Sequence, residues 1–84
     1  MRAIVRTETQ LGCGTTTELY IPEGGAEYAT DKEFYETMEK LYQSDIDYYG
    51  DQVEENEIWS DDLTAHVYTT DYSISYEVAE IKTA

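Results

Sequence analysis

The stretch that decides the fold is TDKEFYETMEKLYQ, at positions 30–43. Thr30 and Glu33 have the spacing of a capping box, in which each side chain accepts a hydrogen bond from the free backbone N–H group of the other residue. Asp31 follows the cap and suits the positive end of a helix dipole. These residues predict that a helix begins at Asp31.

Apolar residues in the same stretch predict which face of the helix is buried. Phe34, Met38 and Leu41 are spaced at i, i+4 and i+7, which places them on one side of a helix, and Tyr42 widens the stripe. The spacing predicts a helix over residues 31–43 that packs this side on a core.

Alternating apolar and polar residues predict strands on both sides of the helix. Before it, Met1–Thr9 and Thr17–Pro22 have the period of two and the β-branched residues of strands, and a Gly- and Thr-rich turn joins them. After it, Leu63–Tyr68 and Ser73–Lys82 show the same alternation around a short polar turn. The pattern predicts one hairpin before the helix and one after it.

The expected fold class is α+β: a small antiparallel sheet of two hairpins with one or two helices inserted between them, in the order ββα(α)ββ. The number of helices stays open because Ser44–Asp62 is ambiguous. Ile46 and Tyr49 suit a helical face, whereas Gly50 interrupts it, so this segment is either a second short helix or an ordered loop. The chain length predicts a single domain, residues 1–84.

The net charge of −14, from 19 acidic and five basic side chains, narrows the class of partner. A small domain needs a charge of only about 2 to 8 for solubility, and a larger excess destabilises the compact state by self-repulsion. Leu41–Ile81 contains eleven acidic residues and no Lys or Arg. Such a chain repels nucleic acid and anionic lipid. We therefore expect a basic protein as partner, and no direct binding to nucleic acid.

Targeting features point to the cytoplasm. The chain has no apolar run of about 18 residues that could span a membrane, and MRAIVRTETQ lacks the apolar stretch of a signal peptide. Cys13 is the only cysteine, which agrees with a reducing compartment. We predict a cytoplasmic protein without a membrane partner, and the oligomeric state stays open.

Carboxylates and aromatic residues gather in DIDYYGDQVEENEIWSDD, at positions 45–62. A disordered acidic tail would lack the aromatic residues. Exposed Tyr and Trp are common anchors of protein interfaces, so the segment is expected to be ordered and to bind a protein. The predicted partner-binding residues are Asp45, Asp47, Tyr48, Tyr49, Asp51, Glu54, Glu55, Glu57, Trp59, Asp61 and Asp62.

The number and spacing of these carboxylates favour imitation of nucleic-acid charge. Carboxylates at i, i+4 on a helix or i, i+2 on a strand lie about 6 Å apart, close to the spacing of successive phosphates. Salt adaptation is an alternative, but it predicts evenly spread acid, whereas the first six residues hold two Arg and no acid. Neutralising carboxylates of the segment, Asp45 among them, should then weaken partner binding and leave the fold intact.

In size and charge the chain resembles the small, strongly acidic proteins of phages and mobile elements, such as anti-CRISPR and anti-restriction proteins. The resemblance implies an inhibitor that occupies the nucleic-acid-binding surface of a basic protein of the nuclease or CRISPR-effector class. The alternative is a non-inhibitory interaction module, such as an antitoxin-like or transcription-regulating subunit.

Calcium is a further possibility that the spacing argues against. Asp45, Asp47 and Asp51 fall at ligand positions of an EF-hand loop, but Asn56 occupies the position at which a bidentate Glu closes the shell. We predict no metal site and no cofactor.

Catalysis has little support in the sequence. His66 is the only histidine and lies within a predicted strand. Cys13 is flanked by glycines, and a negative surrounding charge leaves little of its reactive thiolate. We predict no catalytic residue and no enzymatic activity.

Overall fold

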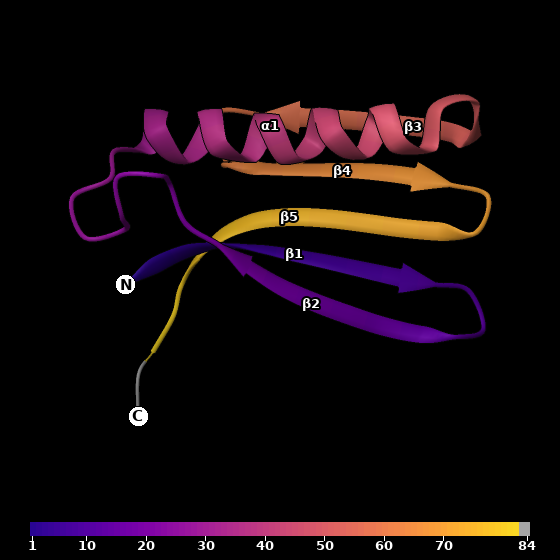
Figure 1. Cartoon of the computed structure of the whole chain (residues 1–84), viewed down its shortest axis with the longest axis horizontal. Helices are drawn as coiled ribbons and strands as arrows, with labels where there is room; N and C mark the ends of the chain where they lie inside the picture. Colours follow the sequence, from indigo (N-terminus) through magenta and orange to yellow (C-terminus); the bar gives the residue numbers. More distant parts are fainter. Residues whose placement is uncertain (83–84) are drawn as a thin grey trace.

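The computed structural model describes residues 1–82, which form a five-stranded antiparallel sheet and one long helix (Figure 1). The strand order in the sheet is β2-β1-β5-β4-β3. In chain order the elements are β1 (Arg2–Gln10), β2 (Gly14–Tyr20), α1 (Asp31–Tyr49), the 3-10 helix η1 (Gly50–Gln52), β3 (Val53–Trp59), β4 (Thr64–Thr69) and β5 (Tyr72–Glu80).

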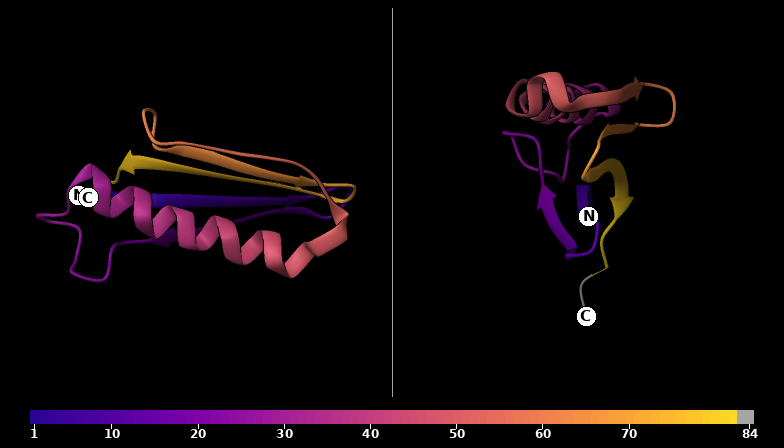
Figure 2. Two further views of the ribbon diagram at one scale, coloured as in Figure 1. Left: turned by 90° about the horizontal axis from the view of Figure 1, so that it is seen from above. Right: turned by 90° about the vertical axis from the view of Figure 1, so that its right-hand side faces the viewer.

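The α+β class, the antiparallel sheet and both predicted hairpins are confirmed. β1 pairs with β2, and β4 pairs with β5. The two hairpins join through β1 and β5, whose register runs from Arg2 opposite Glu80 to Gln10 opposite Tyr72. Helix α1 lies along one face of the strongly twisted sheet (Figure 2), so the molecule has two layers.

Helix α1 begins where the capping box predicts. Thr30 accepts a hydrogen bond from the Glu33 backbone N–H, and the Glu33 carboxylate accepts one from the Thr30 backbone N–H. The predicted end near residue 43 is wrong, because the helix continues to Tyr49. It ends at Gly50, whose φ of 52° suits a residue without a Cβ.

The segment after the helix corrects the sequence prediction. Only one long helix is present in residues 1–82, followed by the single 3-10 turn η1. Residues 53–59 form neither a second helix nor a loop but strand β3, which pairs with β4 at the edge of the sheet. The observed order is therefore ββαβββ, with three strands after the helix.

The core lies between α1 and the sheet. Phe34 and Met38 are fully buried and Tyr42 nearly so, as the helical spacing predicts. They pack in one cluster with side chains from β1, β4 and β5, which are Ile4, Ala65, Val67, Ile74 and Tyr76. In residues 1–82 no helix is both long and apolar enough to cross a membrane.

Candidate functional site

The predicted partner-binding residues divide by exposure into two groups. Asp45 and Tyr49 are half-buried and make contacts within the protein. The others are exposed to solvent and come from the end of α1, from η1, from β3 and from the turn after it. They are Asp47, Tyr48, Asp51, Glu54, Glu55, Glu57, Trp59, Asp61 and Asp62.

Six exposed carboxylates follow the outer edge of the sheet, and we call them the acidic edge: Asp51, Glu54, Glu55, Glu57, Asp61 and Asp62. β3 is an outermost strand, so this edge faces solvent. A register shift between Val53 and Glu55 marks a bulge in its pairing with β4. Residues 41–81 contain no Lys or Arg, so no cationic side chain in this stretch neutralises the edge.

Along β3 the acidic edge has about half the linear charge density of one nucleic-acid strand. A strand rises about 3.3 Å per residue, so the seven residues of β3 cover roughly 20 Å. One strand of a duplex carries a charge every 3.4 Å, hence about six over that length. β3 itself carries three carboxylates, about half this number, while Asp51 lies in η1 before it and Asp61 and Asp62 lie in the turn after it.

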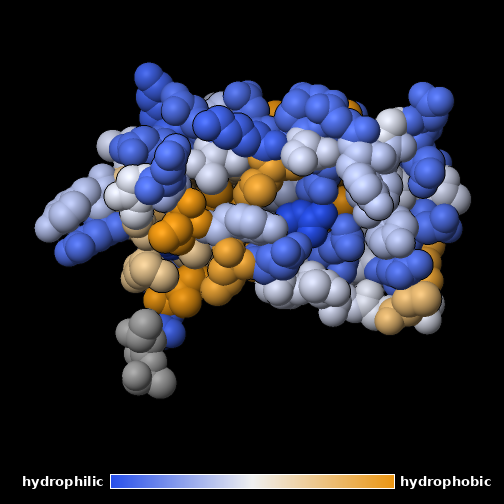
Figure 3. Space-filling model, viewed as in Figure 1, coloured by the Kyte–Doolittle hydropathy of each residue, from blue (hydrophilic) through white to orange (hydrophobic). Residues whose placement is uncertain are grey.

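The exposed side of α1 differs from the acidic edge because its charges are mixed. Lys32 lies 4.0 Å from Glu36, and Lys40 is also exposed on this side. In Figure 3 the helix side, at the top, is largely hydrophilic, and apolar surface gathers below it on the left. The acidic edge therefore differs from the exposed side of α1, which carries charges of both signs.

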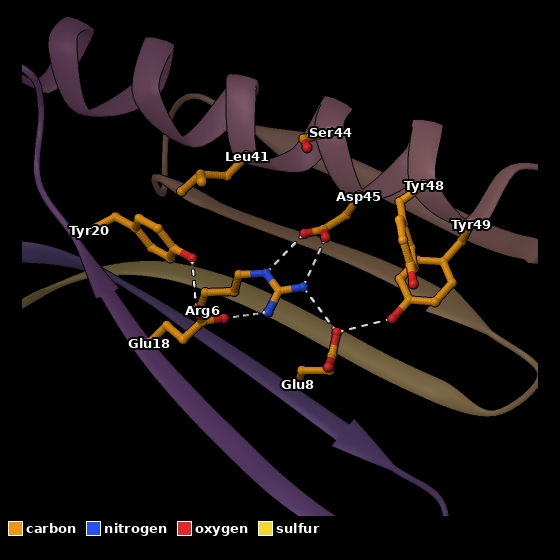
Figure 4. Close-up of a pocket in the computed structure, with 9 residues that line it drawn as sticks. All are labelled: Arg6, Glu8, Glu18, Tyr20, Leu41, Ser44, Asp45, Tyr48 and Tyr49. Carbon is orange, nitrogen blue, oxygen red and sulfur yellow. Dashed lines mark hydrogen bonds and ion pairs between the residues drawn. The ribbon is translucent and has the colours of Figure 1, made fainter.

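Asp45 belongs to a different site, in which Arg6 holds three carboxylates. Its guanidinium donates two hydrogen bonds to Asp45, at 3.0 Å from Nε and 2.8 Å from Nη2. It also donates to Glu18 from Nη1, at 2.9 Å, and to Glu8 from Nη2, at 3.0 Å. We call these four residues the Arg6 centre (Figure 4).

Each carboxylate of the Arg6 centre also accepts a hydrogen bond from a tyrosine hydroxyl. Tyr20 donates to Glu18 and Tyr49 donates to Glu8. Tyr76 donates to Asp45 from within the core. Tyr20 donates to the Glu18 oxygen that Arg6 does not contact, whereas Tyr49 and Tyr76 donate to oxygens that also accept from Arg6. These additional hydrogen bonds reduce the cost of gathering three anions around one cation.

The surroundings shift the pKa values of the groups at this centre. Hydrogen bonding to Asp45 raises the pKa of the Arg6 guanidinium, so Arg6 stays charged. Burial, and then the hydrogen bond to Asp45, raises the pKa of Tyr76. Burial, and then the hydrogen bond to Glu8, raises the pKa of Tyr49 to about 12. The hydroxyls are therefore neutral donors at physiological pH.

The Arg6 centre lies at the bottom of an open groove of about 400 Å³ between α1 and the sheet. Leu41, Ser44 and Tyr48 of the helix complete its wall (Figure 4). With one cation and three carboxylates the groove carries an excess of two negative charges. Its groups already satisfy one another, so we assign the centre to holding α1 on the sheet.

The tyrosines predicted as anchors have different surroundings. Tyr48 is 82% exposed and meets Tyr49 edge-on, with ring centroids 5.0 Å apart. Tyr49 also contacts Tyr72, at 5.3 Å, and its hydroxyl is committed to Glu8. Of this pair, only Tyr48 offers a free ring to a partner.

Trp59 lies in a group of aromatic side chains that sequence reasoning missed. The ring centroid of His66 is 5.4 Å from that of Trp59 and 4.3 Å from that of Tyr68. We call Trp59, His66 and Tyr68 the aromatic row. His66 and Tyr68 alternate with the apolar residues of β4, so the sequence alone predicts that they share one face of the strand. Their contact with Trp59 depends on the pairing of β3 with β4, which the sequence pattern does not predict.

The residues considered for metal binding and catalysis are placed as follows. Asp45, Asp47 and Asp51 lie in the end of α1 and in η1, not in a calcium loop. No group of three or more His, Cys, Asp or Glu side chains suited to a metal ion occurs within residues 1–82. Cys13 is exposed in the turn between β1 and β2.

A scan against protein-family models and searches of curated proteins and of solved structures find no match for this chain.

Proposed function

We propose that this protein is a small acidic inhibitor that imitates nucleic-acid charge and occupies the basic DNA- or RNA-binding surface of a partner. The partner is a nuclease or CRISPR effector, so the protein acts as anti-CRISPR and anti-restriction proteins do. The observation that carries the proposal is the acidic edge, which presents six carboxylates along η1, β3 and the following turn without a Lys or Arg among them.

The physical basis of the proposal is substitution of carboxylates for phosphates. A basic nucleic-acid channel positions Lys and Arg to contact phosphates along a strand. The acidic edge offers those cations a row of six carboxylates, three of them on β3 and three on its flanks. Because the carboxylates are exposed, each ion pair contributes little, and affinity depends on many pairs acting together.

The test is competition for a protein retained from an extract of the native host. The tagged protein should retain a basic protein at low salt, and duplex DNA or guide RNA should displace it. The edge variant carries Asp51→Asn, Glu54→Gln, Glu55→Gln, Glu57→Gln, Asp61→Asn and Asp62→Asn, and should lose retention.

A matched control removes the same number of charges elsewhere. It carries the exposed substitutions Glu23→Gln, Glu27→Gln, Glu36→Gln, Glu39→Gln, Asp71→Asn and Glu80→Gln. This variant should still retain the partner. Equal losses in both variants would show that net charge alone, and not the edge, determines binding.

The second candidate is a non-inhibitory interaction module, such as an antitoxin-like or transcription-regulating subunit. The exposed rings of Trp59 and Tyr68 favour it, because nucleic-acid mimicry alone does not require aromatic contacts. A partner that binds through the edge and resists displacement by both DNA and RNA would support this candidate and contradict the inhibitor.

A further inference from the structure

The face of the sheet opposite α1 brings aromatic rings and carboxylates together. Cross-strand pairs place Glu55 opposite Tyr68, Glu57 opposite His66, and Trp59 opposite Thr64. The residues between them on β4 are buried against the helix, so these six side chains share the other face. We call it the open face.

The aromatic row is ordered and accessible. The rings of His66 and Tyr68 stack with an interplanar angle of 12°, and Trp59 tilts against His66 at 52°. Trp59 is 41% exposed and Tyr68 is 37% exposed, whereas His66 between them is largely covered. The row therefore presents a ring to solvent at each end.

Carboxylates border the row on both sides. Glu55 is exposed, and its Oε1 lies 3.5 Å from Nε2 of His66, a buried nitrogen without a hydrogen-bond partner. Glu57 stands opposite His66, and Glu77 of β5 stands opposite Thr64. No Lys or Arg occurs in the strands that supply these side chains.

We infer that the open face binds arginine side chains of a basic protein, with the guanidinium stacked on Trp59 or Tyr68 and paired with Glu55 or Glu57. This inference rests on the proposed function and names the chemistry by which the partner is recognised. A guanidinium is planar, stacks on aromatic rings and pairs with carboxylates through two N–H groups. Lysine can form the ion pair but lacks the planar group that stacks.

Nucleic-acid bases are a poor alternative occupant of the same rings. Proteins that stack bases on aromatic side chains do so in a positively charged groove that follows the phosphates. Here the rings are bordered by Glu55, Glu57 and Glu77, which repel phosphates. The charge of the open face therefore selects cations.

The test uses Trp59, the only tryptophan, as a fluorescent reporter. The protein is titrated with an oligo-arginine peptide and with an oligo-lysine peptide of equal length and charge. The arginine peptide should bind about three- to fivefold more tightly. It should also shift the NMR signals of the Trp59 indole and the His66 imidazole, and the lysine peptide should shift them much less.

The variant Tyr68→Leu keeps an apolar side chain and the reporter but removes a stacking ring. It should lower the preference for arginine, with Trp59 retaining part of it, and leave affinity for the lysine peptide unchanged. Tyr28→Leu is the control, since Tyr28 is 87% exposed in the loop before α1. It should keep the preference.

The outcomes separate this inference from the proposed function. Binding of both peptides with equal affinity and unshifted Trp59 and His66 signals would refute the arginine site and leave the acidic edge as the binding surface. Binding of neither peptide at low salt would contradict both. The NMR shifts are measured on the unaltered protein, so they decide the question even if Tyr68→Leu fails to fold.

Discussion

At the scale of single residues, Arg6 makes the contact that most changes the interpretation of the sequence. Asp45 looks like one carboxylate of an acidic binding segment, yet both of its oxygens accept hydrogen bonds from Arg6. The pair joins residues 39 positions apart and connects the last part of α1 to β1. Asp45 is therefore better suited to holding the helix than to meeting a partner.

Replacing Asp45 by Asn should destabilise the fold. The change removes the negative charge that accepts two hydrogen bonds from the Arg6 guanidinium, whose side chain is only 11% exposed. We therefore expect the free energy of unfolding to fall by about 1.5 to 3 kcal/mol. Asp47→Asn is the control, because Asp47 is exposed and accepts from Gln43 only. Its effect should stay within about 0.5 kcal/mol in urea unfolding. Equal effects would contradict a structural role for Asp45.

The buried tyrosine hydroxyls predict a loss of stability at high pH. Burial raises the pKa of Tyr42 and Tyr76, and it raises that of Tyr49 to about 12. Since the folded-state pKa exceeds the unfolded value near 10, the neutral form is favoured in the fold. This contribution is complete below pH 10 and is lost as the pH rises from 10 towards 12.

Urea unfolding followed between pH 8 and pH 12 measures this loss. Stability should be constant to about pH 9 and then fall, and phenolate absorbance should show a class of tyrosines that ionise only on unfolding. Tyr49→Phe removes one of these hydroxyls and should make the fall less steep. A stability that is independent of pH over this range would contradict the conclusion that the fold favours the neutral form of these hydroxyls.

At the scale of elements, the sequence predicts those elements whose pattern is local. The capping box identifies the start of α1, and alternation identifies both hairpins. The end of α1 was missed because Gly50 was interpreted as an interruption of the segment after residue 43, whereas it is the residue at which the helix ends. β3 was missed because an edge strand buries little: only Val53 and Ile58 are partly covered, so alternation is weak.

The glutamates of β3 should also protect the edge from pairing with other chains. An exposed edge strand has free N–H and C=O groups, and charged side chains oppose its pairing with a second copy. Replacing Glu54, Glu55 and Glu57 by Thr removes the charges and raises strand propensity. We expect self-association that increases with concentration, measured by sedimentation velocity.

The control for self-association removes three charges outside any strand edge. Glu23, Glu27 and Glu39 are exposed in a loop or on α1, and their replacement by Gln should leave the protein in the same state as the parent chain. Association in both variants would attribute the effect to net charge. Association in neither would show that β3 is protected by its bulge or twist and not by its charges.

At the scale of the whole molecule, salt should have opposite effects on stability and binding. At 0.01 M salt the Debye length is about 30 Å, comparable to the molecular dimensions of 37 × 27 × 20 Å, so most of the like charges repel one another. At 1 M it is about 3 Å. The urea midpoint should therefore rise with NaCl, while affinity for a basic partner falls. A midpoint that falls with salt would indicate that internal ion pairs outweigh the repulsion.

The candidate site could be predicted only in part, because sequence spacing does not determine which strands are neighbours. The carboxylates of the acidic edge lie close together in the chain, within residues 51–62, so the sequence alone identifies them as a group. The aromatic row and the Arg6 centre depend on the pairing of β3 with β4 and on the packing of α1 over β1. Neither arrangement follows from composition.

The pairing of β1 with β5 has a consequence for how the chain folds. These strands form the middle of the sheet, yet they come from opposite ends of the described chain, so a long loop must close before they meet. Such topologies fold slowly. During synthesis the β1–β2 hairpin and α1 emerge first, but they lack their neighbour until β5 leaves the ribosome. The native sheet can therefore assemble only when all of residues 2–80 are available.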